Sequence, residues 1–225
     1  AARRLYLKNS RIQPCRQIHP QLFYLLLESI LPFSAQHQWV LYPVPAQPGD
    51  NGFHGPAGPG AVMAGANPVG IKPYRRTVAQ VRIDPPVSND LPLVLDLRGR
   101  FYFKPESGRL WLSPHDEEPS VACDAAPEEL AVAEAIARLE EVVDWKVAAV
   151  EHKWAGLRSF APDRRPVYGR DPQVEGFAWF AGQGGFGIQT SPAAARLGRQ
   201  LLLDEPRDAM TQGLDTGLYA PGRFG

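Results

Sequence analysis

A dense run of proline and glycine near the N-terminal end constrains this chain more than any other feature. Nine of the seventeen residues in segment 44–60 are Pro or Gly. Proline lacks a backbone donor and glycine weakens regular structure, so this segment cannot continue a helix or a strand ladder. We therefore leave residues 1–60 unassigned, predict a linker at residues 44–60, and expect the ordered fold after it.

Ahead of the linker, the pattern predicts a helix at about residues 20–31 and a short strand at residues 38–42. Basic residues precede the helix, as they do in a targeting peptide. No small-residue cleavage site follows the apolar stretch, so we interpret it as an amphipathic helix of the protein itself.

Composition and charge exclude several classes of protein. Apolar residues make up 44% and charged residues 21% of the chain, which is enough apolar material for a sizeable core. Lys+Arg and Asp+Glu are both 24, and this balance argues against a nucleic-acid binder. No apolar stretch reaches the roughly 18 residues of a membrane span. Two cysteines, Cys15 and Cys123, are too few for a disulfide framework and suit a cytoplasmic protein.

Alternation of apolar and polar residues predicts a sheet in the region after residue 70. The turn at Ser107-Gly108 joins two of its strands in a hairpin. The expected strands cover residues 77–83, 94–97, 99–104, 109–113, 148–157 and 177–182.

Two helices are predicted in the same region. The first covers residues 127–143 and carries an apolar stripe at the spacing of one helix face. Ser191 as N-cap and Pro192 at the first helical position start the second helix, which continues over residues 193–203. This order of elements predicts an α+β fold, in which a mixed, mainly antiparallel sheet packs on a helix.

The segment FAGQGGFGIQTSP, residues 180–192, carries the most chemical information. A buried strand leads through four glycines into a helix. Glycines let the backbone approach a ligand closely, and a helix N-terminus offers free N–H groups to an anion. A plain glycine turn explains the pattern equally well. Gly182, Gly184 and Gly187 have the spacing of the dinucleotide fingerprint, but no βαβ unit follows, so we discount the match.

Single side chains give weaker signals. Arg158 follows a predicted strand, where its guanidinium can hold a carboxylate through two hydrogen bonds, although a surface ion pair is the commoner role. Tyr102 alternates with two phenylalanines and therefore faces away from the core. His115 and His152 lack partners at metal-ligand spacing, so we expect no metal site.

Four segments become specific when they are taken together: KPYRRT at 72–77, FYFKP at 101–105, WAGLRSF at 154–160 and GQGGFGIQTS at 182–191. In this order and at these separations they resemble the C-terminal half of the flavin-dependent D-amino acid oxidase superfamily. The nearest likeness is to the bacterial D-arginine dehydrogenases, and it extends over about residues 61–224.

The resemblance implies a fold and a set of site residues. Residues 61–150 would belong to a substrate-binding domain, and residues 151–225 to the C-terminal part of a glutathione-reductase-type FAD domain. Arg158 and Tyr102 would be the catalytic-site residues that bind the substrate carboxylate. Arg75 would lie near the substrate side chain, and the carbonyl of Gly185 would hold the substrate amino group. The cofactor would be FAD, contacted by Gly184, Gly185, Gly187, Ile188, Gln189 and Thr190.

The implied reaction is oxidation of a D-amino acid, D-arginine-like, to an imino acid and then a 2-oxo acid. A hydride would pass from Cα to flavin N5. The N-terminal G-x-G-x-x-G half of the family has no match in residues 1–60, so we expect a missing FAD-binding half as a partner. Two alternatives stay open: a truncated non-catalytic remnant or one half of a split flavoenzyme, and an amine oxidase of the glycine or sarcosine oxidase type.

Overall fold

A computed structural model of the chain describes residues 61–62 and 64–225. The helix predicted at residues 20–31, the strand at 38–42 and the linker at 44–60 lie outside the described residues. Within the described part, no helix is both long and apolar enough to cross a membrane.

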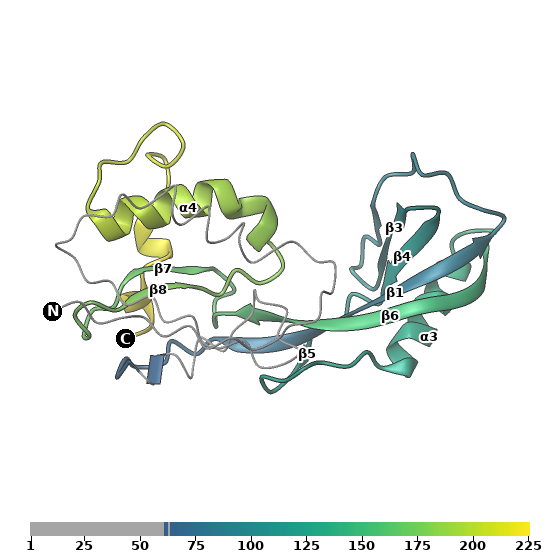
Figure 1. Cartoon of the computed structure of the whole chain (residues 1–225), viewed down its shortest axis with the longest axis horizontal. Helices are drawn as coiled ribbons and strands as arrows, with labels where there is room; N and C mark the ends of the chain where they lie inside the picture. The colour runs from purple at the N-terminus through teal and green to yellow at the C-terminus, as the bar shows by residue number, and fades with distance from the viewer. Residues whose placement is uncertain (1–60, 63) are drawn as a thin grey trace, which may run out of the picture. The chain divides into compact units, whose positions relative to one another are not determined.

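A six-stranded sheet carries most of the fold (Figure 1). Its longest strands, β1 and β6, pair along the whole length of β1, and β4 and β5 share the opposite edge of β1. Every strand pair in the described residues is antiparallel, so the parallel pairs expected of a mixed sheet are not found there. The strands are β1 (Lys72–Asp84), β2 (Val94–Leu95), β3 (Tyr102–Glu106), β4 (Arg109–Ser113), β5 (Glu118–Pro119) and β6 (Lys146–Phe160).

The predicted hairpin is confirmed as β3 and β4. Glu106 pairs with Arg109, so the loop between them has two residues, Ser107 and Gly108. Both have positive φ, 52° and 73°. This is the backbone of a type I′ turn, whose twist matches that of the strands it joins.

The core lies between the sheet and helix α3 (Glu129–Glu140), which confirms the predicted packing of sheet on helix. Alternate residues of each strand point at the helix, and the apolar stripe of α3 points back. The helix is shorter than the predicted 127–143, and its last predicted residues form a turn. The core residues are Ala79, Val81, Ile83, Phe101, Phe103, Leu110, Leu112, Val132, Ala135 and Leu139.

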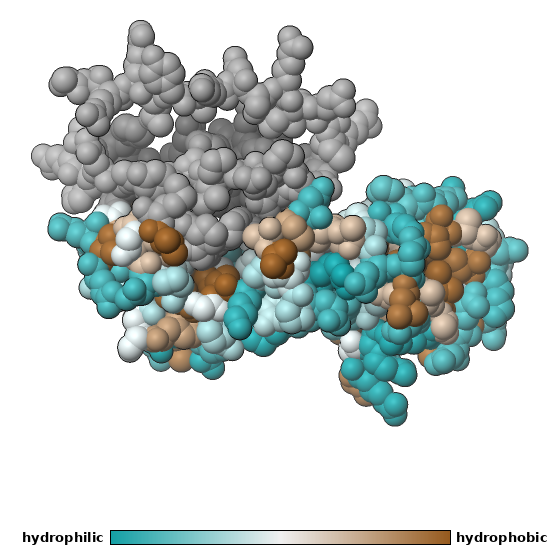
Figure 2. All heavy atoms as spheres, turned by 90° about the horizontal axis from the view of Figure 1, so that it is seen from below, coloured by the Kyte–Doolittle hydropathy of each residue, from teal (hydrophilic) through white to brown (hydrophobic). Residues whose placement is uncertain are grey.

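Apolar side chains also reach the surface near this core. Figure 2 shows brown, apolar patches within the hydrophilic surface at the end of the described region that carries α3. Leu130 in α3 and Val142 beyond its end are among the exposed apolar side chains. Helix α3 therefore offers a buried and an exposed leucine for comparison.

We expect Leu139→Ala to lower the free energy of unfolding by about 2–5 kcal/mol, because it leaves a cavity in the core. Leu139 is 0% exposed, whereas Leu130, on the same helix, is 69% exposed. The matched variant Leu130→Ala should change stability by no more than about 0.5 kcal/mol. Urea unfolding followed by circular dichroism measures both, and equal losses would contradict the packing of α3 described above.

The C-terminal part of the chain is a second group of elements. Strand β7 (Val167–Arg170) pairs with β8 (Ala178–Ala181) in a two-stranded sheet, and α4 (Gly187–Leu203) lies along this hairpin in Figure 1. The sequence predicted β8 but not β7. Tyr168 of β7 is buried and stacks on Phe180, and desolvation raises its pKa to about 12.

Helix α4 begins earlier than predicted. Its first residue is Gly187, and Ser191 and Pro192 lie inside it, so the expected N-cap at Ser191 is wrong. Pro192 has no N–H to donate to the carbonyl of Ile188, four residues before it. The hydroxyl of Ser191 donates to that carbonyl instead, at 2.8 Å, so the proline is accommodated within the helix.

Candidate functional site

Two neighbouring arginines of β1 project from opposite faces of the sheet, because successive strand residues alternate. Arg75 lies on the α3 face, where it pairs with Asp116 at 3.5 Å and Glu128 at 2.7 Å. Arg76 lies on the other face, where its Nη2 atom contacts Oε1 of Glu117 at 2.9 Å. Arg75 was expected near the substrate side chain, and the structure pairs it with carboxylates on the core side of the sheet instead.

Arg76, which was not among the predicted site residues, shares its face with two that were, Tyr102 and Arg158. Tyr74 pairs directly with Arg158 of β6, so the side chains of Tyr74, Arg76 and Arg158 project from one side of the sheet. Tyr102 lies between Phe101 and Phe103, which point into the core, and it therefore projects from that same side. Arg158 and Tyr102 are thus on one face of the sheet, as the predicted site requires.

Burial and the neighbouring side chains shift the pKa of Arg76. Burial lowers the pKa of Arg76, and the positive charge of Arg158 lowers it further. Tyr102, Glu117 and Asp116 act in the opposite direction. The Arg76 side chain is 3% exposed, and its Nε and Nη1 atoms are buried without a hydrogen-bond partner among the described residues. Arg76 was not predicted from the sequence, although its alternation with Thr77, Ala79 and Val81 indicates that it lies on the face opposite the core.

The glycine segment lies against the end of β6. The N–H of Gly184 donates to the carbonyl of Ser159 at 3.0 Å. A Cβ atom on Gly185 would lie 2.9 Å from Nη1 of Arg158, so the loop and this guanidinium are in close contact. A Cβ atom on Gly184 would lie 2.1 Å from the ring of Phe160. Packing within the protein therefore accounts for both glycines, and the structure brings Gly185 and Arg158 together.

The first turn of α4 follows this loop directly. Its first N–H groups, from Gly187 to Gln189, have no acceptor within the helix, and Phe186 at the N-cap makes no side-chain hydrogen bond. Phe186 and Ile188 are 56% and 74% exposed. Free N–H groups beside exposed apolar side chains suit the edge of a planar ring that carries partial negative charge, such as an isoalloxazine. The run that was expected to contact FAD thus fits the ring end of that cofactor.

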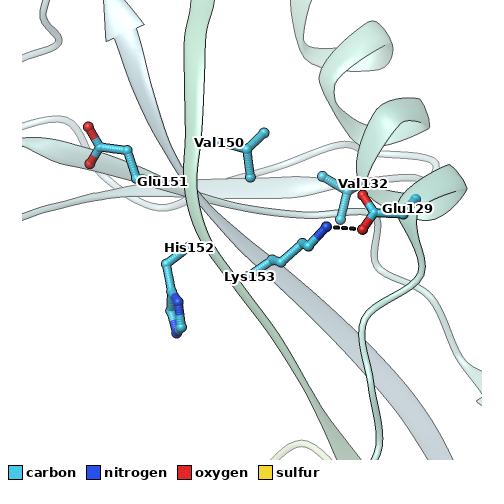
Figure 3. A pocket seen from close by; sticks show the side chains of 6 residues that line it. All are labelled: Glu129, Val132, Val150, Glu151, His152 and Lys153. Atoms are coloured by element: carbon cyan, nitrogen blue, oxygen red, sulfur yellow. Dashed lines mark hydrogen bonds and ion pairs between the residues drawn. The ribbon is translucent and has the colours of Figure 1, made fainter.

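A cavity of about 330 Å³ lies elsewhere, between β6 and the start of α3. Figure 3 shows that Lys153 points at Glu129, with which it forms an ion pair, whereas Glu151 and His152 point away from that pair. These charged groups do not converge on a ligand. Nor do the described residues contain a cluster of three His, Cys, Asp or Glu side chains that could hold a metal ion.

Known proteins resemble this chain in sequence and fold. Residues 55–201 match the family model of the FAD dependent oxidoreductases, DAO. L-proline dehydrogenase from P. horikoshii has a similar structure, with a TM-score of 0.60 and 21% identity over 73% of this chain and 43% of that one. Glycine oxidase from Geobacillus kaustophilus has a TM-score of 0.57 and 22% sequence identity, over 71% of this chain and 41% of that one. Iminodiacetate oxidase from Chelativorans sp. BNC1 has a TM-score of 0.56 and 18% sequence identity, over 68% of this chain and 40% of that one. The chain thus spans about two fifths of these structures.

Proposed function

Because the chain belongs to the FAD dependent oxidoreductase family, we propose that it forms the substrate-binding part of a flavoenzyme that oxidises amino acids. The contact between Arg158 and Gly185, beside the free N–H groups of α4, is the observation that carries this proposal. It joins a residue suited to a carboxylate with a helix end suited to the flavin ring. We propose a substrate-binding part at residues 61–150 and the C-terminal part of an FAD domain at residues 151–225.

Each side chain of the site has a role in holding the substrate. The Arg158 guanidinium binds the carboxylate through two hydrogen bonds, and the Tyr102 hydroxyl donates to the same group. The carbonyl of Gly185 accepts a hydrogen bond from the amino group. These contacts fix Cα in one orientation, which accelerates transfer of its hydride. FAD, when bound, would accept the hydride of Cα at N5. The N–H groups of the first turn of α4 stabilise negative charge at the ring edge.

The side chain of the substrate is a finer question. The resemblance favours a D-arginine-like substrate, whose guanidinium needs a carboxylate partner. On the face of Arg158, the carboxylate of Glu117 already pairs with Arg76 and Arg164. A partner for a D-arginine side chain would therefore come from outside the described residues, from the N-terminal FAD-binding half that we propose as the partner of this chain.

The test is to supply that half, by joining the N-terminal FAD-binding half of a full-length family member upstream of residue 61. We expect the joined protein to bind FAD and its flavin to lose visible absorbance when a D-amino acid is added without oxygen. Reduction by glycine or sarcosine alone would favour an amine oxidase of that type. Bound FAD that no amino acid reduces would favour the non-catalytic remnant.

In that protein, Arg158→Ala should raise KM for the amino acid by about two to four orders of magnitude. The variant removes two charge-assisted hydrogen bonds, each about 1.5–3 kcal/mol, and about 1.4 kcal/mol corresponds to tenfold. Steady-state kinetics checks this, with Arg165→Ala as the control, because Arg165 is an exposed arginine of the next loop. An unchanged KM in Arg158→Ala would remove Arg158 from the site.

A further inference from the structure

The charges on the Arg158 face exceed what one substrate carboxylate can balance. We propose that Arg158 and Arg76 together bind the two carboxylates of an amino or imino dicarboxylic acid. This inference rests on the proposed function and names the class of its substrate.

The register of the sheet sets the two guanidiniums side by side. Tyr74 pairs with Arg158, and Arg76 is the next residue of β1 on the same face. Such diagonal neighbours on paired strands lie about 7–8 Å apart, within reach of long side chains. One small molecule with an acid group at each end can therefore contact both arginines.

The guanidinium of Arg76 has hydrogen-bond donors without acceptors among the described residues. Its Nη2 atom is bound by Glu117, whereas Nε and Nη1 are buried and have no hydrogen-bond partner among the described residues. A buried donor without a partner destabilises the protein, and more so when it is charged. An α-carboxylate bound to Arg158 occupies that guanidinium, so the free donors of Arg76 are left for a second acid group.

A count of charges gives the same answer. Glu117 is the one carboxylate that the described residues place in contact with Arg76 and Arg164, and Arg158 has none. The Arg164 guanidinium contacts Glu117 at 2.5 Å and lies 4.1 Å from the centre of the Phe160 ring. Three positive groups thus face one negative group. A dicarboxylate restores the balance, whereas a guanidinium side chain adds to the repulsion.

Arg75 shows that this shortage of carboxylates is specific to the face of the sheet that carries Arg158. It is adjacent in sequence, yet it pairs with both Asp116 and Glu128, and its hydrogen bond to Glu128 raises its pKa. Asp116 also accepts hydrogen bonds from the N–H and the hydroxyl of Thr77. The arginine on the core side therefore has two carboxylates, while the arginine on the site side has one that it shares.

The experiment measures binding to the purified 225-residue chain without FAD, by calorimetry or by NMR of the arginine Nε–H groups. The probes are D-aspartate and iminodiacetate as dicarboxylates, D-alanine as a monocarboxylate, D-arginine, and sulfate as a plain dianion. We expect the dicarboxylates to bind at least about tenfold more tightly than D-alanine, which is the gain of one further charge-assisted contact. D-arginine should bind least tightly.

Two variants assign the effect to its residue. Arg76→Gln should abolish the preference for dicarboxylates, and Arg75→Gln should retain it, with circular dichroism to show that both are folded. The order of ligands in the wild-type chain tests the proposal even where Arg76→Gln does not fold. The proposal is overturned if D-arginine or sulfate binds as tightly as the dicarboxylates, or if the dicarboxylates show no saturable binding. It is also overturned if folded Arg76→Gln still prefers dicarboxylates to D-alanine. A chain that prefers dicarboxylates but never supports flavin reduction would instead reject the proposed function.

Discussion

The 225-residue chain is expected to purify without stoichiometric FAD and to leave D-arginine and other D-amino acids unoxidised. FAD is held by its adenosine and pyrophosphate as well as by its ring, and the pyrophosphate normally lies on a glycine loop at the N-terminus of a βαβ helix. The described residues contain one strand–glycine–helix sequence, from β8 to α4. There the strand belongs to an antiparallel hairpin, and the ring of Phe160 already fills the space beside Gly184.

The expected loss of affinity for FAD is large because several hydrogen bonds to the pyrophosphate are absent together. Hydrogen bonds to a charged group contribute about 1.5–3 kcal/mol each, and about 1.4 kcal/mol corresponds to tenfold in affinity. Affinity for FAD should therefore fall by orders of magnitude relative to a complete family member. The visible spectrum of the purified chain, and of the flavin released on denaturation, measures this directly. A yellow protein that turns over D-amino acids would show that residues 1–60 supply the cofactor site in another way.

Gly184→Ala is expected to lower the free energy of unfolding by about 2–5 kcal/mol. Two costs add at this position. Gly184 has φ of +55°, in the left-handed region that costs an alanine about 1–2 kcal/mol. Its new Cβ atom would lie 2.1 to 2.8 Å from three atoms of the Phe160 ring, and such overpacking costs about 1–3 kcal/mol.

Gly176→Ala is the matched control for this variant. Gly176 has φ of +78°, but a Cβ atom there would meet no atom within 4 Å, so only the backbone cost of about 1–2 kcal/mol remains. The difference between the two variants in urea unfolding isolates the contact with Phe160. Replacing Phe160 by alanine should remove that difference. Equal losses in Gly184→Ala and Gly176→Ala would mean that β6 and the glycine loop are not in close contact.

Features that depend on neighbours along the chain could be predicted from the sequence. Alternation placed strands at β1, β3 and β4, and the Ser107-Gly108 turn fixed the hairpin, because a two-residue loop leaves little choice of register. The apolar stripe of α3 determined which side of the helix would face the sheet. Four short motifs predicted the family, and the family model confirms it over residues 55–201.

Tertiary structure decided what depends on contacts between distant segments. Four residues of β7 carry too weak a pattern, and they form a strand because β8 lies beside them. Helix α4 begins at Gly187 and continues through Pro192, where the Ser191 hydroxyl donates to the carbonyl of Ile188 that the proline cannot bond. Arg75 and Arg76 are equivalent as residue types, and only the face on which α3 packs separates them. Side-chain contacts across the fold, rather than residue type, therefore decided which arginine pairs with two carboxylates and which shares a single carboxylate beside Arg158.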